Sequence, residues 1–372
     1  MRIWQGLVVL GLCWLLGLVD PLEAGEKLDP RLAPLFTPPA DLANDFGAYR
    51  SPLQFNDDSE VKNATDWARR RKEILTTWHE LMGPWPALIE KPKIEYLAEE
   101  RRDNFKQHHV RIEIAPDRMT NDAYLLVPDG EGPFPAVLVV YYDAKTGIGL
   151  GKELRDFGYQ LAKRGFVVLS LGGPEGRPAA VKDQPILQPL SYNAYVAANC
   201  HTLLANLAKV DPERIGVVGH SYGGKWAMFA SCLHESFACG VWSDGGIVFD
   251  EKRSNVNYWE PWYLGLEEGQ ARKPGIPTDD NPRTGAYKRM METGRDLHEL
   301  HALMAPRPFL VSGGSEDHVQ RWKALNHTIA VNRLLGHDNR VAMSNRQGHA
   351  PTPESNEQIY QFFEHALRKK SD

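Results

Sequence analysis

From Pro135 onward, short apolar runs alternate with stretches of helical periodicity, and this alternation constrains the fold more than any other feature. The apolar runs cover residues 136–142, 166–171, 215–219, 240–242, 308–312 and 340–343, and helix-like stretches lie at 153–164, 194–208 and 223–232. Strands buried on both faces appear as continuous apolar runs, and the helices between them cover a parallel sheet. The sequence therefore predicts an α/β fold with a mostly parallel central sheet and helices on both faces.

The part before this alternation has a different character. Residues 25–60 are rich in Pro, Asp and Asn without a clear period, and Trp67, Ile74, Trp78 and Met82 then recur at the spacing of one helix face. Strand-like runs follow at 93–96, 109–114 and 123–127. We expect residues 25–92 to form an N-terminal extension whose helix packs on a core domain at 93–372.

The first residues have the pattern of a targeting segment. Arg2 precedes an apolar run at residues 7–19, which is short for a membrane span and is followed by Leu22-Glu-Ala24. This pattern predicts a signal peptide over residues 1–24 and a secreted or periplasmic protein. The alternative is an anchor that stays attached. The remaining cysteines, Cys200, Cys232 and Cys239, are too few for a disulfide framework, so one bridge or three buried thiols are both compatible with the sequence.

A long segment, residues 249–303, separates two of the predicted strands. It contains Tyr258-Trp259-Glu-Pro-Trp262-Tyr263. Connections of this length within a domain are usually functional or disordered, and this density of aromatic residues argues against disorder. We expect an insertion or lid, in which Trp259 and Trp262 either form a platform for sugar rings or belong to the core.

The strongest local signal is Gly219-His-Ser221-Tyr-Gly223, which lies between an apolar strand and a helix. In this G-x-S-x-G pattern, glycines flank a serine on a turn that is too sharp for nearby β-carbons. The turn exposes the serine hydroxyl and directs the start of the helix toward the reacting atoms. Ser221 is therefore the predicted nucleophile.

A serine hydroxyl needs a base to become a good nucleophile, and this pattern predicts an acid and then a histidine later in the chain. Asp317 follows the strand at 308–312, with Glu316 as its neighbour and competitor, and His349 lies in a turn before the last helix. The predicted triad is Ser221, Asp317 and His349. The predicted oxyanion donors are the backbone N–H groups of Tyr222 and of Asp143 or Tyr142.

These motifs resemble the α/β-hydrolase superfamily over residues 95–370, and more narrowly the acetyl xylan esterase-like and glucuronoyl esterases of bacteria. The narrower resemblance is carried by the Arg-rich helix at 67–75, by Asp211-Pro-Glu-Arg-Ile-Gly, by Ser221-Tyr-Gly-Gly-Lys225 and by residues 296–308. It implies that Lys225 contacts sugar hydroxyls. It also makes Asp244 an alternative acid or a substrate contact. Tyr222 departs from the pattern, because glucuronoyl esterases have an arginine directly after the serine.

Composition narrows the functional classes. The formal net charge is −5, with 43 Lys and Arg against 48 Asp and Glu, so a basic nucleic-acid-binding surface is not expected. Neither a metal site nor a cofactor-binding motif is predicted. We expect a serine-dependent carboxylic ester hydrolase acting on polysaccharide or oligosaccharide esters through an acyl-enzyme. The alternatives are a prolyl-oligopeptidase-like peptidase and a catalytically silent carbohydrate-binding or scaffold protein. The sequence leaves the oligomeric state open.

Overall fold

The computed structural model describes residues 28–174 and 185–367. The expected signal peptide at residues 1–24 lies outside these residues. Among the helices that are described, none is both long enough and apolar enough to cross a lipid bilayer.

A single twisted sheet forms the centre of the molecule, in the strand order β1-β2-β4-β6-β5-β7-β8-β9-β10, with β3 paired to β2. Its antiparallel part contains β1 (Ile94–Arg102), β2 (Phe105–Ala115), β3 (Arg118–Met119) and β4 (Ala123–Pro128). Its parallel part contains β6 (Val167–Leu171), β5 (Phe134–Val140), β7 (Val210–His220), β8 (Cys239–Ser243), β9 (Phe309–Gly313) and β10 (Val341–Asn345). The predicted α/β fold with a mostly parallel central sheet is confirmed.

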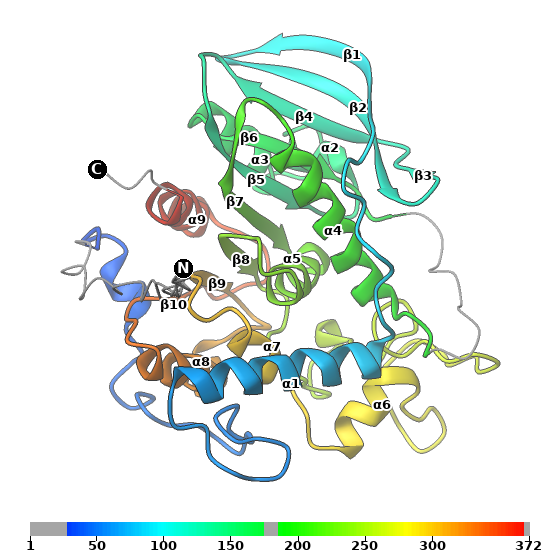
Figure 1. Ribbon diagram of the computed structural model, residues 1–372, viewed down its shortest axis with the longest axis vertical. Helices are drawn as coiled ribbons and strands as arrows, with labels where there is room; N and C mark the ends of the chain where they lie inside the picture. Colours follow the sequence, from blue (N-terminus) through cyan, green and yellow to red (C-terminus); the bar gives the residue numbers. More distant parts are fainter. Residues whose placement is uncertain (1–27, 175–184, 368–372) are drawn as a thin grey trace, which may run out of the picture.

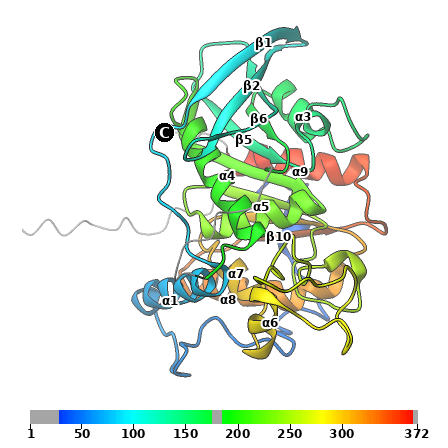
Figure 2. The same ribbon diagram turned by 90° about the vertical axis from the view of Figure 1, so that its right-hand side faces the viewer.

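The helices lie on both faces of this sheet (Figures 1 and 2). They are α1 (Ala64–Met82), α2 (Ala144–Gly147), α3 (Phe157–Lys163), α4 (Pro189–Ala205), α5 (Tyr222–Leu233), α6 (Gly285–Glu292), α7 (His298–Ala302), α8 (Trp322–Leu334) and α9 (Pro353–Ala366), with short 3-10 turns at Ala33–Phe36, Ser254–Val256 and Val319–Arg321. Helices α2, α6 and α8 lie outside the stretches that were predicted to be helical from the sequence.

The alternation of side chains along β5 explains the two layers. Leu138 and Val140 point into a core cluster shared with α1, α4, α5, α7 and α8, whereas Val137 and Val139 point into a second cluster shared with α3 and α9. All four side chains are at most 2% exposed. A strand buried on both faces has no polar side, which is why these strands appear as continuous apolar runs in the sequence.

Helix α1 has the predicted apolar face, since Trp67, Ile74, Trp78 and Met82 are buried. It lies on the far side of the molecule from the β1–β2 end of the sheet (Figure 1). Its fully buried Arg70 forms ion pairs with Glu73 and, at 3.6 Å, with Glu299 at α7. This charged contact ties the helix before the sheet to the segment between β8 and β9.

Candidate active site

Ser221 lies on the tight turn between β7 and α5. It has a φ angle of +56°, a left-handed backbone that few residues other than glycine adopt, and its N–H donates to the Ser243 carbonyl at 2.8 Å. A β-carbon on Gly219 would lie 2.2 Å from the Gly223 carbonyl oxygen, and one on Gly223 would lie 2.1 Å from that of Val140. Both flanking glycines are therefore required by close backbone contacts, as expected of a strained turn that presents the hydroxyl.

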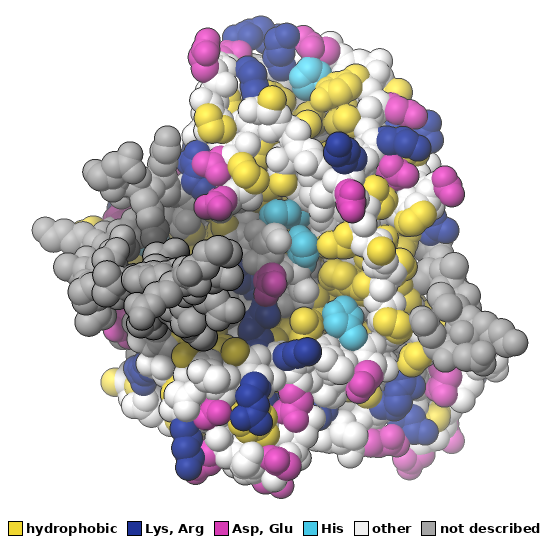
Figure 3. Space-filling view, viewed as in Figure 1, with side chains coloured by type: hydrophobic (Ala, Val, Ile, Leu, Met, Phe, Trp, Pro, Cys, Tyr) yellow, Lys and Arg dark blue, Asp and Glu magenta, His cyan; other side chains and the backbone are white. Residues whose placement is uncertain are grey.

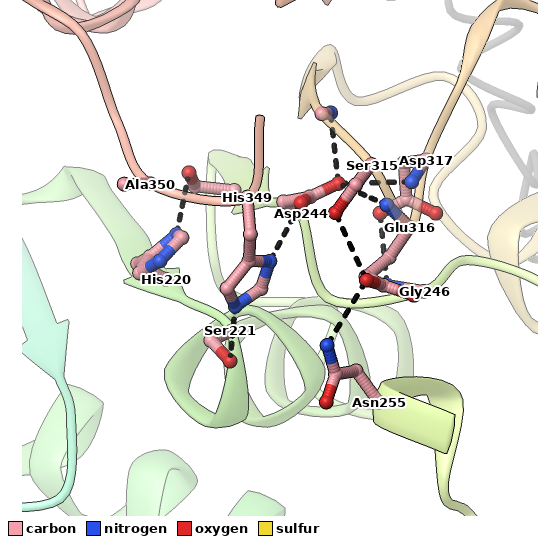
Figure 4. A network of polar contacts seen from close by, with 12 residues as sticks. His220, Ser221, Asp244, Gly246, Asn255, Ser315, Glu316, Asp317, His349 and Ala350 are labelled. Atoms are coloured by element: carbon pink, nitrogen blue, oxygen red, sulfur yellow. Dashed lines mark hydrogen bonds and ion pairs between the residues drawn. The ribbon is translucent and has the colours of Figure 1, made fainter. Parts of the chain in front are cut away.

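His349 follows β10 and precedes α9, and its ring reaches Ser221 (Figure 4). Its Nε2 lies 2.9 Å from Ser221 Oγ, although 128 positions separate the two residues in sequence. The parallel strands β7 and β10 end at the same edge of the sheet, which brings the two loops together. The structure thus places the predicted base within hydrogen-bond distance of the predicted nucleophile.

The acid beside His349 is Asp244, and the prediction of Asp317 in this position is wrong. His349 Nδ1 lies 2.7 Å from Asp244 Oδ2, and the Asp244 side chain is fully buried. Asp244 comes directly after β8, the neighbour of β7, and its φ of +48° turns the chain sharply at the strand end. Because of this turn, its carboxylate stands beside the histidine loop.

Asp317 instead binds the loop that follows Asp244. Its carboxylate oxygens accept the N–H groups of Gly246 at 2.9 Å and Ile247 at 2.6 Å. In return, Asp244 Oδ1 accepts the N–H groups of Gly314, Glu316 and Asp317 at 2.8–3.1 Å. Burial, and then the nearby charge of Asp244, raises the pKa of Asp317. The two carboxylates therefore hold the ends of β8 and β9 together.

The competing Glu316 also lies away from the histidine. Its Oε1 accepts from the hydroxyl of Ser315 at 2.9 Å and from the side-chain amide of Asn255 at 3.2 Å, as Figure 4 shows. Glu316 therefore stabilises the contact between the β9 loop and the segment that follows β8.

Two further residues, Arg346 and His220, surround His349. Arg346 Nη2 and Nε donate to the carbonyls of His349 and Ala350 at 2.8 Å, and its Nη1 donates to the Ser312 carbonyl at 2.8 Å. His220 packs its ring against that of His349 at 4.8 Å, and burial lowers its pKa well below the ordinary value, so it stays neutral. Sequence reasoning missed Arg346, whose only signal was its position three residues before His349.

The predicted oxyanion donors are located at two facing backbone segments. Tyr222 is the first residue of α5, and Tyr142 and Asp143 follow the end of β5, the strand next to β7. The Asp143 carboxylate accepts the backbone N–H of Thr146 at 2.8 Å and so caps the short helix α2. The backbone at 142–143 is therefore held by a defined turn beside the nucleophile strand.

The other residues predicted to contact substrate differ in their exposure to solvent. Trp259 is fully buried, so its prediction as an exposed platform is wrong, whereas Trp262 is 48% exposed. Lys225 is only 2% exposed, and its Nζ donates to the Asn255 carbonyl at 2.9 Å. Burial lowers the pKa of Lys225 to about 8. The buried ammonium of Lys225 binds a carbonyl of the protein itself and is closed to solvent. The prediction that Lys225 contacts a sugar is therefore contradicted.

The three cysteines of the described chain, Cys200, Cys232 and Cys239, are buried free thiols. Across residues 28–174 and 185–367, no group of three or more His, Cys, Asp or Glu side chains is arranged to hold a metal ion. On the face shown in Figure 3, Lys and Arg side chains are interspersed with Asp and Glu.

The chain is similar in sequence to known hydrolases. The model of the prolyl oligopeptidase family matches residues 196–370, which contain the serine, both aspartates and the histidine. A 2,6-dihydropseudooxynicotine hydrolase from Paenarthrobacter nicotinovorans is 28% identical over 155 residues. That match covers 40% of this chain and 37% of the relative, so the chain spans little more than a third of the relative's length.

Solved structures match over more of the chain. A glucuronoyl esterase from Solibacter usitatus is similar with a TM-score of 0.68 and 18% identity, over 87% of this chain and 98% of that chain. A carbohydrate esterase family 15 glucuronoyl esterase from Caldicellulosiruptor kristjansonii is similar with a TM-score of 0.62 and 21% identity, over 87% and 91% of the two chains. Together with the sheet and its two helical layers, these likenesses identify the chain as an α/β-hydrolase-fold protein that resembles carbohydrate esterases.

Proposed function

We propose that this protein is a serine-dependent carboxylic ester hydrolase acting on esters of carbohydrates. The observation that carries the proposal is the continuous relay from Ser221 Oγ through His349 to Asp244, with distances of 2.9 and 2.7 Å. Hydroxyl, imidazole and buried carboxylate in this order are the groups that nucleophilic acyl transfer needs.

In the proposed reaction, His349 Nε2 removes the proton of Ser221 as Oγ attacks the ester carbonyl carbon. The imidazolium that forms donates through Nδ1 to Asp244, which stabilises its charge and fixes the ring. The proton then passes from Nε2 to the leaving alcohol, and an acyl-serine remains. Water attacks the acyl-serine with His349 again as base, which releases the acid and restores the serine.

The negative oxygen of each tetrahedral intermediate is proposed to accept two backbone N–H groups, that of Tyr222 and that of Asp143 or Tyr142. Donors that are fixed before the reaction stabilise this charge without reorganisation, and loss of one such donor typically lowers kcat about 10²–10³-fold. The turn at Ser221 and the cap at Asp143 fix these two segments.

Support for a carbohydrate substrate comes from the names of the two glucuronoyl esterases of similar structure. The acyl group is best tested directly, with acetylated xylan, methyl glucuronate, a feruloyl ester and short nitrophenyl esters compared on one preparation. Turnover of the nitrophenyl esters without any sugar ester would keep the esterase proposal and contradict the carbohydrate assignment.

The catalytic proposal is tested by labelling with a fluorescent fluorophosphonate, which reacts with activated serines. We expect the wild-type chain to be labelled, Ser221→Ala to be unlabelled, and the control Ser59→Ala, which alters an exposed serine, to be labelled like the wild type. Ser221→Ala and His349→Ala are each expected to lower kcat by about 10³-fold or more. A silent carbohydrate-binding or scaffold protein would not be labelled at all.

A second candidate, a serine peptidase, is favoured by the match to the prolyl oligopeptidase family over residues 196–370. The same relay can attack an amide, so the substrate decides between the two activities. p-Nitrophenyl acetate and a proline-containing chromogenic peptide should be compared. We expect hydrolysis of the acetate alone, and cleavage of the peptide at comparable kcat/KM would favour the peptidase.

We also propose that the chain is exported, on the signal-peptide pattern of residues 1–24. Expression in a bacterial host followed by N-terminal sequencing of the extracytoplasmic fraction tests this. A mature N-terminus close to Gly25 is expected, and retention of Met1 on a membrane-bound form would contradict cleavage.

A further inference from the structure

A pocket of about 500 Å³ lies at the carboxyl ends of β5 and β6. Its wall includes Tyr142, Asp143, Gly172 and Gly173, which directly follow these two strands. The neighbouring strand β7 ends at Ser221, and ligands of parallel sheets bind outside the carboxyl ends of the strands. The pocket therefore lies on the proposed oxyanion side of the site, one strand away from the reacting hydroxyl.

The contact between this pocket and the site is made by Tyr222, the residue after the nucleophile. A β-carbon on Gly173 would lie 3.2 Å from the Tyr222 hydroxyl oxygen, so the glycine wall touches this side chain. Tyr222 also receives a hydrogen bond from the side-chain amide of Asn193 at 2.8 Å. Tyr222, which directly follows the serine, therefore contacts the glycine wall of the pocket and is held there by Asn193.

Tyr142 lines the pocket and has a largely exposed aromatic ring. Its side chain is 57% exposed, among the most exposed large hydrophobic side chains of the described chain. The ring stacks on Tyr222 at 4.7 Å with an interplanar angle of 25°, and its hydroxyl is hydrogen-bonded to that of Tyr263. The ring is therefore held in one orientation although half of it meets solvent, as expected of a platform for another flat, partly apolar group.

The rest of the pocket combines apolar side chains with polar ones whose charges nearly balance. The hairpin that carries β3 and leads into β4 contributes Arg118, Asn121 and Asp122, and Asp143 also lines the pocket. Asp122 already pairs with His109 at 2.7 Å, and Arg118 already donates to Tyr192 at 3.1 Å. With two carboxylates and one guanidinium, the lining has no excess positive charge to attract an anionic ligand, whereas the hydroxyl groups of an uncharged ring can both donate and accept hydrogen bonds. Glycines at 172 and 173 leave room for such a ring close to the backbone.

We propose that this pocket is a subsite for a neutral pyranose residue of the substrate glycan, with Tyr142 as its stacking platform. The inference rests on the proposed carbohydrate esterase function and adds to it the class of sugar and the residue that binds it. The C–H face of the sugar lies on the Tyr142 ring, and its hydroxyls reach the hairpin residues Asn121 and Asp122.

The test is calorimetric titration of the full chain with unesterified xylohexaose, mannohexaose, cellohexaose and trigalacturonate, so that binding is measured without catalysis. We expect at least one neutral hexaose to bind and trigalacturonate not to bind. Tyr142→Ala should raise the dissociation constant about 10-fold or more, because the stacking surface is lost. Tyr142→Phe, which keeps the ring, should bind within about threefold of the wild type.

Two control variants identify the binding position. Tyr96→Ala removes an aromatic ring of matched exposure, 55%, that lines a different pocket, and should leave binding unchanged. Trp262→Ala removes the other exposed aromatic candidate. Loss of binding in Trp262→Ala with full binding in Tyr142→Ala would overturn the proposal, as would selective binding of trigalacturonate. If p-nitrophenyl acetate is hydrolysed but no hexaose binds, the subsite is refuted while the esterase proposal stands.

Discussion

Replacing Asp244 and Asp317 separately with asparagine gives the sharpest test of the site, because the two carboxylates have different hydrogen-bond partners. In Asp244, one carboxylate oxygen faces His349 and the other accepts three backbone N–H groups. In Asp244→Asn, the amide oxygen should stay with the three donors, because an NH2 group there would meet only other donors. The new NH2 group then faces His349 Nδ1 and donates to it.

This geometry sets the expected size of the loss in kcat. A histidine that accepts at Nδ1 must carry its proton on Nε2, so it has no lone pair for the Ser221 hydroxyl. The wrong tautomer of a triad histidine costs about 10⁴-fold in kcat. We therefore expect Asp244→Asn to lower kcat by about 10³–10⁴-fold with a small change in Tm, since the three backbone hydrogen bonds are kept.

Asp317→Asn should have the opposite effect, with a large loss of stability and a small loss of kcat. Both oxygens of Asp317 accept backbone N–H groups, so one of these bonds is replaced by a contact between two donors. Leaving a buried donor without a partner costs about 1–3 kcal/mol, and the loss should appear as a lower Tm with kcat reduced less than about 30-fold.

The assay is kcat for p-nitrophenyl acetate together with thermal unfolding of the wild type and both variants, at a temperature where all are folded. Fluorophosphonate labelling rates provide an independent measure of the serine. The reasoning fails if folded Asp317→Asn loses about 10³-fold in kcat while Asp244→Asn remains nearly as active as the wild type.

Three further predictions concern groups around the site. Arg346→Lys should lower kcat about 10–100-fold with little change in KM, because one ammonium cannot make the contacts by which the guanidinium holds the His349 loop; an unchanged kcat would show that the loop needs no such support. Burial raises the pKa of Asp296 from 3.8 to about 7, so the folded protein binds a proton that the unfolded chain has lost, and wild-type stability should fall between pH 4 and 7. Asp296→Asn should remove the part of this fall that Asp296 causes, leaving the smaller part due to Asp317, and should gain up to about 4 kcal/mol relative to the wild type above pH 7, as measured by urea unfolding; parallel pH profiles would contradict the assignment. Trp259→Ala should destabilise the protein by about 3–5 kcal/mol in the same urea assay, whereas Trp262→Ala, at an exposed position, should change stability by less than about 0.5 kcal/mol; equal losses would contradict the different burial of the two indoles.

Local patterns in the sequence were sufficient to predict the central sheet and its helical layers. They were also sufficient to predict the paired serine and histidine. The apolar runs predicted most strands, because a strand covered on both faces leaves no polar position in its own sequence. The turn at Ser221 was predictable for a similar reason, since backbone contacts of 2.1 and 2.2 Å at the positions of missing β-carbons require glycines on both sides. His349 followed from chain order, because this fold returns to the same sheet edge before its last helix.

The choice between Asp244 and Asp317 depended on the tertiary structure. Both follow strands that end at the same edge of the sheet, so sequence position cannot distinguish them. The left-handed backbone of Asp244 and the hydrogen bonds of each carboxylate to the other loop set the directions of the two side chains. The sequence also left the burial of Trp259 open and did not predict that of Lys225. Trp259 belongs to the long connection between β8 and β9, and Asn255 of the same connection accepts the Lys225 ammonium. The sequence by itself determined which residues could react, whereas the packing of distant loops decided which carboxylate meets the imidazole and which aromatic rings remain open to a ligand.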